Sequence, residues 1–133
     1  MKGLETYQEI AVTTQSGGRL VVMLYDGAIK FLKRAVNELN AGNMAEKGLY
    51  INKALDIINE LNNVLDMDAG GEIAANLRTL YLFMARHLNS ANIKKDPQMI
   101  GDVISLLEEL NQGWKAITRN STLESEISRR SAE

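Results

Sequence analysis

The chain has 133 residues, 45% of them hydrophobic and 24% charged, which fits one folded domain and excludes an intrinsically disordered chain. Its 15 basic and 17 acidic residues give a formal net charge of -2 and are spread along the whole chain, so no basic stripe is available to bind nucleic acid. There is no cysteine for disulfides or thiolate metal sites, and no apolar run of about 18 residues or signal-peptide pattern, so we expect a cytoplasmic protein without membrane insertion.

Residues 1–15 are expected to form a short N-terminal helical arm. Leu4, Tyr7 and Ile10 recur at helical spacing in a segment too short to be a stable helix by itself, so the arm should dock on the rest of the domain. Two interpretations are equally open. The arm is either a lid over a binding groove or a fixed strap that completes the core.

Helix-ending residues divide the rest of the chain. Ser16 can cap a first helix, and Gly42 can end it by adopting the left-handed conformation. Asn43 starts a capping box for the second helix, Gly70-Gly71 forms the next break, and Pro97 suits the first turn of a last helix. The predicted helices cover about residues 16–41, 43–66, 72–94 and 97–119.

Apolar residues recur at alternating steps of three and four in all four segments, which is the period of a helix with one buried face. Short loops force antiparallel neighbours, so residues 16–119 are predicted to form an all-α, antiparallel up-down-up-down four-helix bundle. Residues 120–133 are expected to be a mobile or weakly helical tail. The expected seam residues are Val22, Tyr25, Ile29, Leu32, Val36 and Leu39; Ile51, Ala54, Ile58, Leu61 and Leu65; Ile73, Leu77, Leu80, Met84, His87 and Ala91; and Ile100, Val103, Leu107, Leu110, Trp114 and Ile117.

Surplus apolar residues lie beside these seams. The first helix has a second stripe and the second helix an apolar flank, and one seam does not cover both sides of a helix. Two explanations stay open: a buried face broadened by one position, or a surface that a partner covers. The surplus residues are Leu20, Leu24, Ala28, Phe31 and Ala35, and then Tyr50, Ile57 and Val64, with Leu82 and Phe83 off the third seam.

Catalytic and metal chemistry find little support in the sequence. His87, the one histidine, occupies a seam position without a second histidine near it, which favours a core or boundary side chain over a metal ligand or base. The Glu-x-x-His pairs of di-metal bundles are missing. We therefore expect no enzyme, no catalytic residue, no metal and no cofactor. Gly27 costs a helix about 1 kcal/mol unless another segment approaches closely, so beside Asp26 and Gly27 we expect the arm or a bound partner.

The segment from Tyr7 to Leu32 resembles the signature of the flagellin-specific export chaperones, the FliS family, which reads approximately Y-x4-V-x-T-A-S-P-x-x-L-I-x-M-L-Y-D-G-A-I. "GGEIAANLRTLY", "ANIKKD" and Trp114 are similar to later parts of the family pattern, so the resemblance covers about residues 4–119. Gln15 and Gly17 replace the usual alanine and proline, which should loosen the first turn of the first helix. The matching residues are Tyr7, Val12, Thr14, Ser16, Leu20, Val21, the run Met23 to Ile29, and Leu32.

The resemblance implies a cytoplasmic chaperone that binds the disordered C-terminal segment of flagellin, prevents premature polymerisation and delivers flagellin to the type III export gate. An anti-sigma factor is a further candidate partner. The alternative is a self-associating helical adaptor, and a dimeric free chain would favour it over the largely monomeric chaperone. Because an amphipathic client needs long apolar grooves, the expected client-binding residues are Leu4, Tyr7, Ile10, Leu20, Leu24, Phe31, Tyr50, Ile57, Val64 and Tyr81.

Overall fold

The computed structural model describes residues 17–132, so the predicted arm, with Leu4, Tyr7 and Ile10, lies outside the described residues. The described part of the chain is helical and contains no strand. The prediction of an all-α four-helix bundle is confirmed. The helices are α2 (Gly17–Asn40), α3 (Met44–Asn63), α4 (Met67–Lys94) and α5 (Pro97–Ala132).

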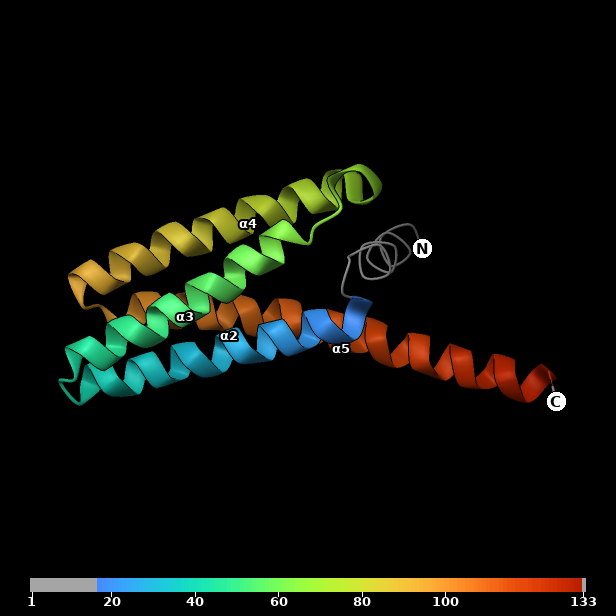
Figure 1. The fold of residues 1–133 in the computed structure, drawn as a ribbon, viewed down its shortest axis with the longest axis horizontal. Helices are drawn as coiled ribbons and strands as arrows, with labels where there is room; N and C mark the ends of the chain where they lie inside the picture. The colour runs from blue at the N-terminus through green and yellow to red at the C-terminus, as the bar shows by residue number, and fades with distance from the viewer. Residues whose placement is uncertain (1–16, 133) are drawn as a thin grey trace.

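Each helix packs against two neighbours. Helix α2 contacts α3 and α5, and α4 contacts the same two helices from the other side. The chain reverses direction along the long axis of the bundle at each connection, and α5 extends beyond the other helices at its C-terminal end (Figure 1). Helix α5 thus continues past residue 119, where the sequence predicted its end. The described residues include no helix with the length and apolar content to span a bilayer.

Glycine and cap residues account for the connections. Gly42 adopts a φ of 83° after α2, as the sequence predicted, because a residue without Cβ enters this region at little cost. Asp66 accepts a hydrogen bond from the backbone N–H of Ala69 at 3.0 Å and caps α4. Gly71, with φ 54° and ψ -128°, kinks α4 after its first turn. The predicted break at the glycine pair is therefore a kink near the start of a helix.

The capping box predicted at Asn43 does not form. The Asn43 side chain makes no capping hydrogen bond, and its Nδ2 donates to Glu38 Oε2 at 2.8 Å instead. This bond ties the connection back onto the end of α2. Helix α3 therefore begins without a side-chain cap, and its stability must come from packing on the bundle.

The core confirms four of the five seam residues predicted for the second helix, with Val64 buried in place of Leu65. It shifts the seams of α2 and α4 by one residue at alternate positions. On α2, Ala28 and Ala35 take interior positions predicted for larger residues, and a small side chain there lets the neighbouring helix approach closely. On α4 only Ala74 does so, while Tyr81 and Leu88 take the other two shifted positions. The displaced seam residues, such as Val22, Ile29 and Ile73, are only partly buried. The buried residues are Val21, Tyr25, Ala28, Leu32, Ala35 and Leu39 on α2 and Ala74, Leu77, Tyr81, Met84, Leu88 and Ala91 on α4.

Three aromatic residues join α2, α4 and α5 inside the bundle. The hydroxyls of Tyr25 and Tyr81 lie 2.6 Å apart and share a hydrogen bond, and the Trp114 ring centroid lies 6.3 Å from that of Tyr25. Burial, together with the neighbouring Tyr25, raises the pKa of the Tyr81 hydroxyl well above its ordinary value. Tyr81, predicted as a client contact, is 2% exposed. The structure corrects this prediction, because the Tyr81 hydroxyl finds its partner in the core.

Candidate functional site

Partly exposed apolar residues gather on the outer side of the α2–α3 pair. Leu20, Leu24 and Phe31 follow one another on one face of α2 because residues four and seven apart share a face. The Phe31 ring stacks on that of Tyr50 from α3, with centroids 6.1 Å apart and an interplanar angle of 26°. Leu20 is 39% exposed, and the others are half-buried. We call this surface the α2–α3 stripe: Leu20, Leu24, Phe31, Tyr50 and Ile57.

Gly27 lies at the centre of the stripe. A Cβ atom at this position would lie 3.3 Å from Ile57 Cδ1, closer than ordinary van der Waals contact. The missing side chain therefore lets α3 approach α2. The sequence predicted that the arm or a bound partner lies beside Gly27. Among the described residues the segment that approaches Gly27 is neither of these but α3.

Positive charges border the stripe at one end. The Arg34 guanidinium lies 5.1 Å from the centroid of the Tyr50 ring, and the Lys53 ammonium lies 5.4 Å from the Phe31 centroid and 5.6 Å from that of Tyr50. Such distances allow cation–π attraction. These residues border an open groove of about 600 Å³, which we call the aromatic-basic groove. Its lining residues are Asp26, Ile29, Lys30, Phe31, Lys33, Arg34, Asn37, Tyr50 and Lys53.

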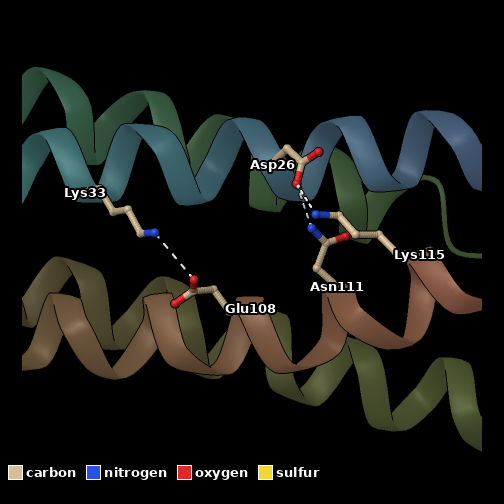
Figure 2. A network of polar contacts seen from close by, with 5 residues as sticks. All are labelled: Asp26, Lys33, Glu108, Asn111 and Lys115. Atoms are coloured by element: carbon tan, nitrogen blue, oxygen red, sulfur yellow. Dashed lines mark hydrogen bonds and ion pairs between the residues drawn. The ribbon is translucent and has the colours of Figure 1, made fainter.

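A polar network connects α2 to α5 (Figure 2). Asp26 Oδ1 accepts a hydrogen bond from Asn111 Nδ2 at 2.8 Å and lies 3.3 Å from Lys115 Nζ. About two turns further along α2, Lys33 Nζ lies 3.5 Å from Glu108 Oε2. Asn111 is 3% exposed, and its Oδ1 has no hydrogen-bond partner among the described residues. The network fixes the orientation of Asp26 toward α5, and its exposed ion pairs add little stability.

The comparison with known proteins decides the family. The sequence profile of the family described as "Flagellar protein FliS" matches residues 1–121 of the chain. The chain belongs to the FliS family. The profile covers the bundle and ends within α5, so the last turns of α5 lie outside the family match.

Curated relatives agree with the family match. The chain is 41% identical over 122 residues to the flagellar secretion chaperone FliS of Vibrio cholerae, across 88% of this chain and 90% of that protein. It is 39% identical over 127 residues to the protein of that name from Salmonella typhimurium, across 92% and 94% of the two chains. The Bacillus subtilis flagellar secretion chaperone FliS is 35% identical over 109 residues, across 82% and 80%. FliS is a family of chaperones, so this chain is a flagellar export chaperone and not an enzyme.

With the FliS family established, the predicted client residues divide into three groups. Five form the α2–α3 stripe, which the structure brings together on one surface. Val64, 8% exposed, and Tyr81 are buried and do not reach that surface. The three arm residues lie outside the described part of the chain.

A second apolar opening lies between α4 and α5. It has a volume of about 300 Å³ and includes Leu77, Leu110, Trp114 and Ile117 in its lining. The sequence assigned all four residues to seams. In the structure Leu77, Trp114 and Ile117 are buried, as in a closed core, whereas Leu110 is half-buried. The apolar periodicity did not predict a pocket here. In the sequence, a seam residue beside a glycine such as Gly113 cannot be distinguished from any other seam residue.

His87 lies at the edge of the α4–α5 contact. Its Nε2 lies 3.1 Å from Asp102 Oδ2, and its ring stacks on Phe83 with centroids 5.0 Å apart. Hydrogen bonds from His87 and then from Gln98 lower the pKa of the Asp102 carboxyl. The sequence expected a core or boundary side chain at a seam position; the structure places His87 at the boundary, and Leu88 takes the seam position. The described residues contain no group of three or more histidine, cysteine or acidic side chains placed to hold a metal.

Proposed function

We propose that this FliS-family chain binds the disordered C-terminal segment of flagellin in the cytoplasm, prevents its premature polymerisation and delivers it to the type III export gate. The observation that carries the proposal is the α2–α3 stripe. Its five apolar side chains stay partly exposed although the same helices bury a complete seam. Soluble chains usually cover such an apolar surface with a partner.

The energetics of a disordered client favour a long contact. Ordering such a segment costs several kcal/mol, and coupled folding and binding typically buries about 1,000 to 3,000 Å². An amphipathic helix on the stripe would place apolar residues at helical spacing against Leu24, Ile57 and Phe31. The α4–α5 opening offers a second apolar contact for a client that continues around the bundle.

The N-terminal arm is part of the proposal. We propose that residues 1–15 cover part of the client surface in the free chain and leave it, or join the interface, when flagellin binds. Deleting residues 1–14 should then change client affinity much more than the melting temperature. Unchanged affinity in the truncated chain would identify the arm as a fixed strap.

The decisive experiment titrates the flagellin C-terminal segment into the full chain by isothermal calorimetry. Leu20→Glu places a charge on the exposed end of the stripe and should weaken binding at least tenfold, because a bound apolar helix would desolvate the carboxylate. Ile57→Glu tests the middle of the stripe. Leu82→Glu is the matched control, since Leu82 is 51% exposed on α4 and lies off the stripe. Equal binding by the parent chain and both stripe variants would refute a client site here.

Sedimentation of the free chain distinguishes the chaperone proposal from the alternative, a self-associating helical adaptor. The chaperone proposal expects a largely monomeric chain that forms a complex with the flagellin segment. A dimer that persists on dilution, and in which Leu20→Glu produces monomers, would identify the stripe as a self-association surface. The complex of the chain with the flagellin segment can then be tested for binding to export-gate components and to an anti-sigma factor, which we propose as further partners.

A further inference from the structure

The aromatic-basic groove has a charge that the chain as a whole does not share. Lys30, Lys33, Arg34 and Lys53 contribute four positive charges to its lining, and Asp26 contributes the one carboxylate. The complete chain has a net charge of -2. A local excess of one sign in a groove raises the concentration of the opposite charge there. The groove therefore favours an anionic group.

The network with α5 reduces the effect of Asp26 on this groove. Figure 2 shows the Asp26 carboxylate directed toward α5, where its Oδ1 meets Asn111 and, at 3.3 Å, Lys115 Nζ. Lys33 is likewise drawn toward Glu108 of α5. One carboxylate and one lysine of the lining are thus paired outside the groove, and the charge of the groove depends on the remaining three cations.

Those three cations are poorly neutralised. No carboxylate among the described residues lies within ion-pair distance of the Lys30 or Lys53 ammonium, and Arg34 pairs through Nε with Glu38 at 3.4 Å, which leaves its terminal N–H groups available. Lys53 and Arg34 lie over the rings of Phe31 and Tyr50. The aromatic faces hold the two cations beside an apolar floor without neutralising them.

We propose that the aromatic-basic groove binds an acidic stretch of the exported client. Aspartate or glutamate carboxylates would lie between Lys30, Arg34 and Lys53, with the adjacent methylene groups against Phe31 and Tyr50. This inference rests on the proposed function. It is supported by continuity, because Phe31 and Tyr50 belong to both the stripe and the groove, so a client segment on the stripe reaches the cations.

The number of available cations in the groove suits a peptide contact rather than a nucleic-acid backbone. A protein that binds a phosphate backbone neutralises a row of phosphates with many cations, whereas this groove has three available cations in a chain with a net negative charge. Protein carboxylates need only a few charge-assisted contacts. These contacts would set the register of an otherwise adaptable apolar client.

The test removes the positive charge from the groove and, separately, the negative charge from the client segment. Lys30→Met/Lys53→Met keeps the unbranched stems, Lys30→Glu/Lys53→Glu reverses the charge, and Arg86→Glu, on the exposed side of α4, is the control for a change of net charge. Each chain is titrated with the flagellin C-terminal segment and with the same segment in which every Asp and Glu is changed to Asn or Gln. Titrations in 50 mM and 500 mM NaCl measure the salt dependence, and circular dichroism melts confirm folding.

We expect the charge-reversed double variant to bind the native segment about tenfold or more weakly than the parent chain, from the loss of two ion-pair contacts and the added repulsion. The amide-substituted segment should bind all four chains alike. Affinity of the parent chain should fall with salt more steeply than that of the methionine variant. Arg86→Glu should bind like the parent.

Two results would overturn the inference. Equal affinity of the lysine variants and the parent for the native segment would show that the cations are not used, and an equal loss for both segments would show that the lysines act through packing. In either case strong binding by the parent chain leaves the proposed function standing. Absence of binding by the parent chain to both segments would instead refute the proposed function.

Discussion

The buried tyrosine pair gives the sharpest test of the core. Tyr25 Oη and Tyr81 Oη are 2.6 Å apart, and both side chains are almost completely buried. The Tyr25→Phe substitution removes one hydroxyl and leaves the Tyr81 hydroxyl inside the bundle. Among the described residues, the Tyr81 hydroxyl forms its hydrogen bond with Tyr25. Tyr25→Phe should therefore strand a buried polar group.

The expected cost follows from that stranded group. A buried hydroxyl without a partner costs about 1 to 3 kcal/mol, while the net value of the hydrogen bond itself is about 1 kcal/mol. At about 2.1 cal/mol/K of unfolding entropy per residue, a chain of 133 residues loses about 4 °C in melting temperature for each kcal/mol. Tyr25→Phe should lower the melting temperature by about 4 to 12 °C.

Thermal and urea unfolding, followed by circular dichroism, measure the effect. Tyr81→Phe serves as the matched variant, and the double variant Tyr25→Phe/Tyr81→Phe should be more stable than the sum of the two single losses predicts, because Tyr81 then has no hydroxyl to strand. If Tyr25→Phe melts like the parent, the Tyr81 hydroxyl has another partner or reaches water, and its assignment to a closed core is refuted. A loss of client affinity in Tyr81→Phe without loss of stability would return Tyr81 to the client contacts.

Three further predictions concern buried polar groups. Stability should fall as the pH rises above about 10, the ordinary tyrosine pKa, because the unfolded chain then releases the Tyr81 proton that the folded chain retains; Tyr81→Phe should weaken this dependence in melts from pH 8 to 11. Lys47, whose buried Nζ donates to the Asn92 carbonyl at 3.0 Å, should tolerate Met better than Ala, with a loss of about 1 kcal/mol against about 2 to 3 in urea unfolding. Asn111→Leu should change the melting temperature by less than about 4 °C, because removal of a buried carbonyl without a partner among the described residues offsets the lost bond from Nδ2 to the exposed Asp26 carboxylate; a larger fall would contradict this expectation.

The helices and their order were predictable because local rules determine them. Gly42 enters the left-handed region and Gly71 kinks α4, and only glycine adopts such conformations readily. The end of α5 was not predictable from composition. Residues beyond 119 are mostly polar and charged, with Leu123 and Ile127 as the large apolar residues, which suits a solvent-exposed helix as well as a tail without regular structure.

The orientation of α2 and α4 could not be read from periodicity alone. Val21 and Val22 are equally apolar, and the pattern beginning at either one continues at steps of three and four. The structure selects Val21 with Ala28 and Ala35, because close packing against α3 and α5 favours small residues at the contact. Choosing between two such stripes requires knowledge of the neighbouring helices, which a single sequence does not contain.

The same limit separates the site residues that were predicted from those that were missed. The half-buried positions of Phe31, Tyr50 and Ile57 were predictable because an apolar residue beside a seam is visible in one helix, and their contact with a client stays a prediction. Asn111 was missed, since a buried amide becomes recognisable only when its partner Asp26 on another helix is known. Charge depends on tertiary context only in part, because Lys30, Lys33 and Arg34 share one face of α2 in the sequence, whereas Lys53 joins them only where α2 meets α3.

The proposed function gives a physical reason why the buried face of α2 could not be identified from the sequence. A helix that buries Tyr25 and Leu32 and also keeps Leu24 and Phe31 at the surface must be apolar on more than one side, and periodicity then cannot distinguish inside from outside. Half-burial limits the consequence for solubility, because Phe31 and Tyr50 cover each other and are covered by Arg34 and Lys53. A client that displaces these cations from the rings, or supplies carboxylates to them, would reach an apolar surface that water contacts only in part. Under the proposed function, the α2–α3 stripe and the adjoining aromatic-basic groove together suit a partner that is both apolar and acidic.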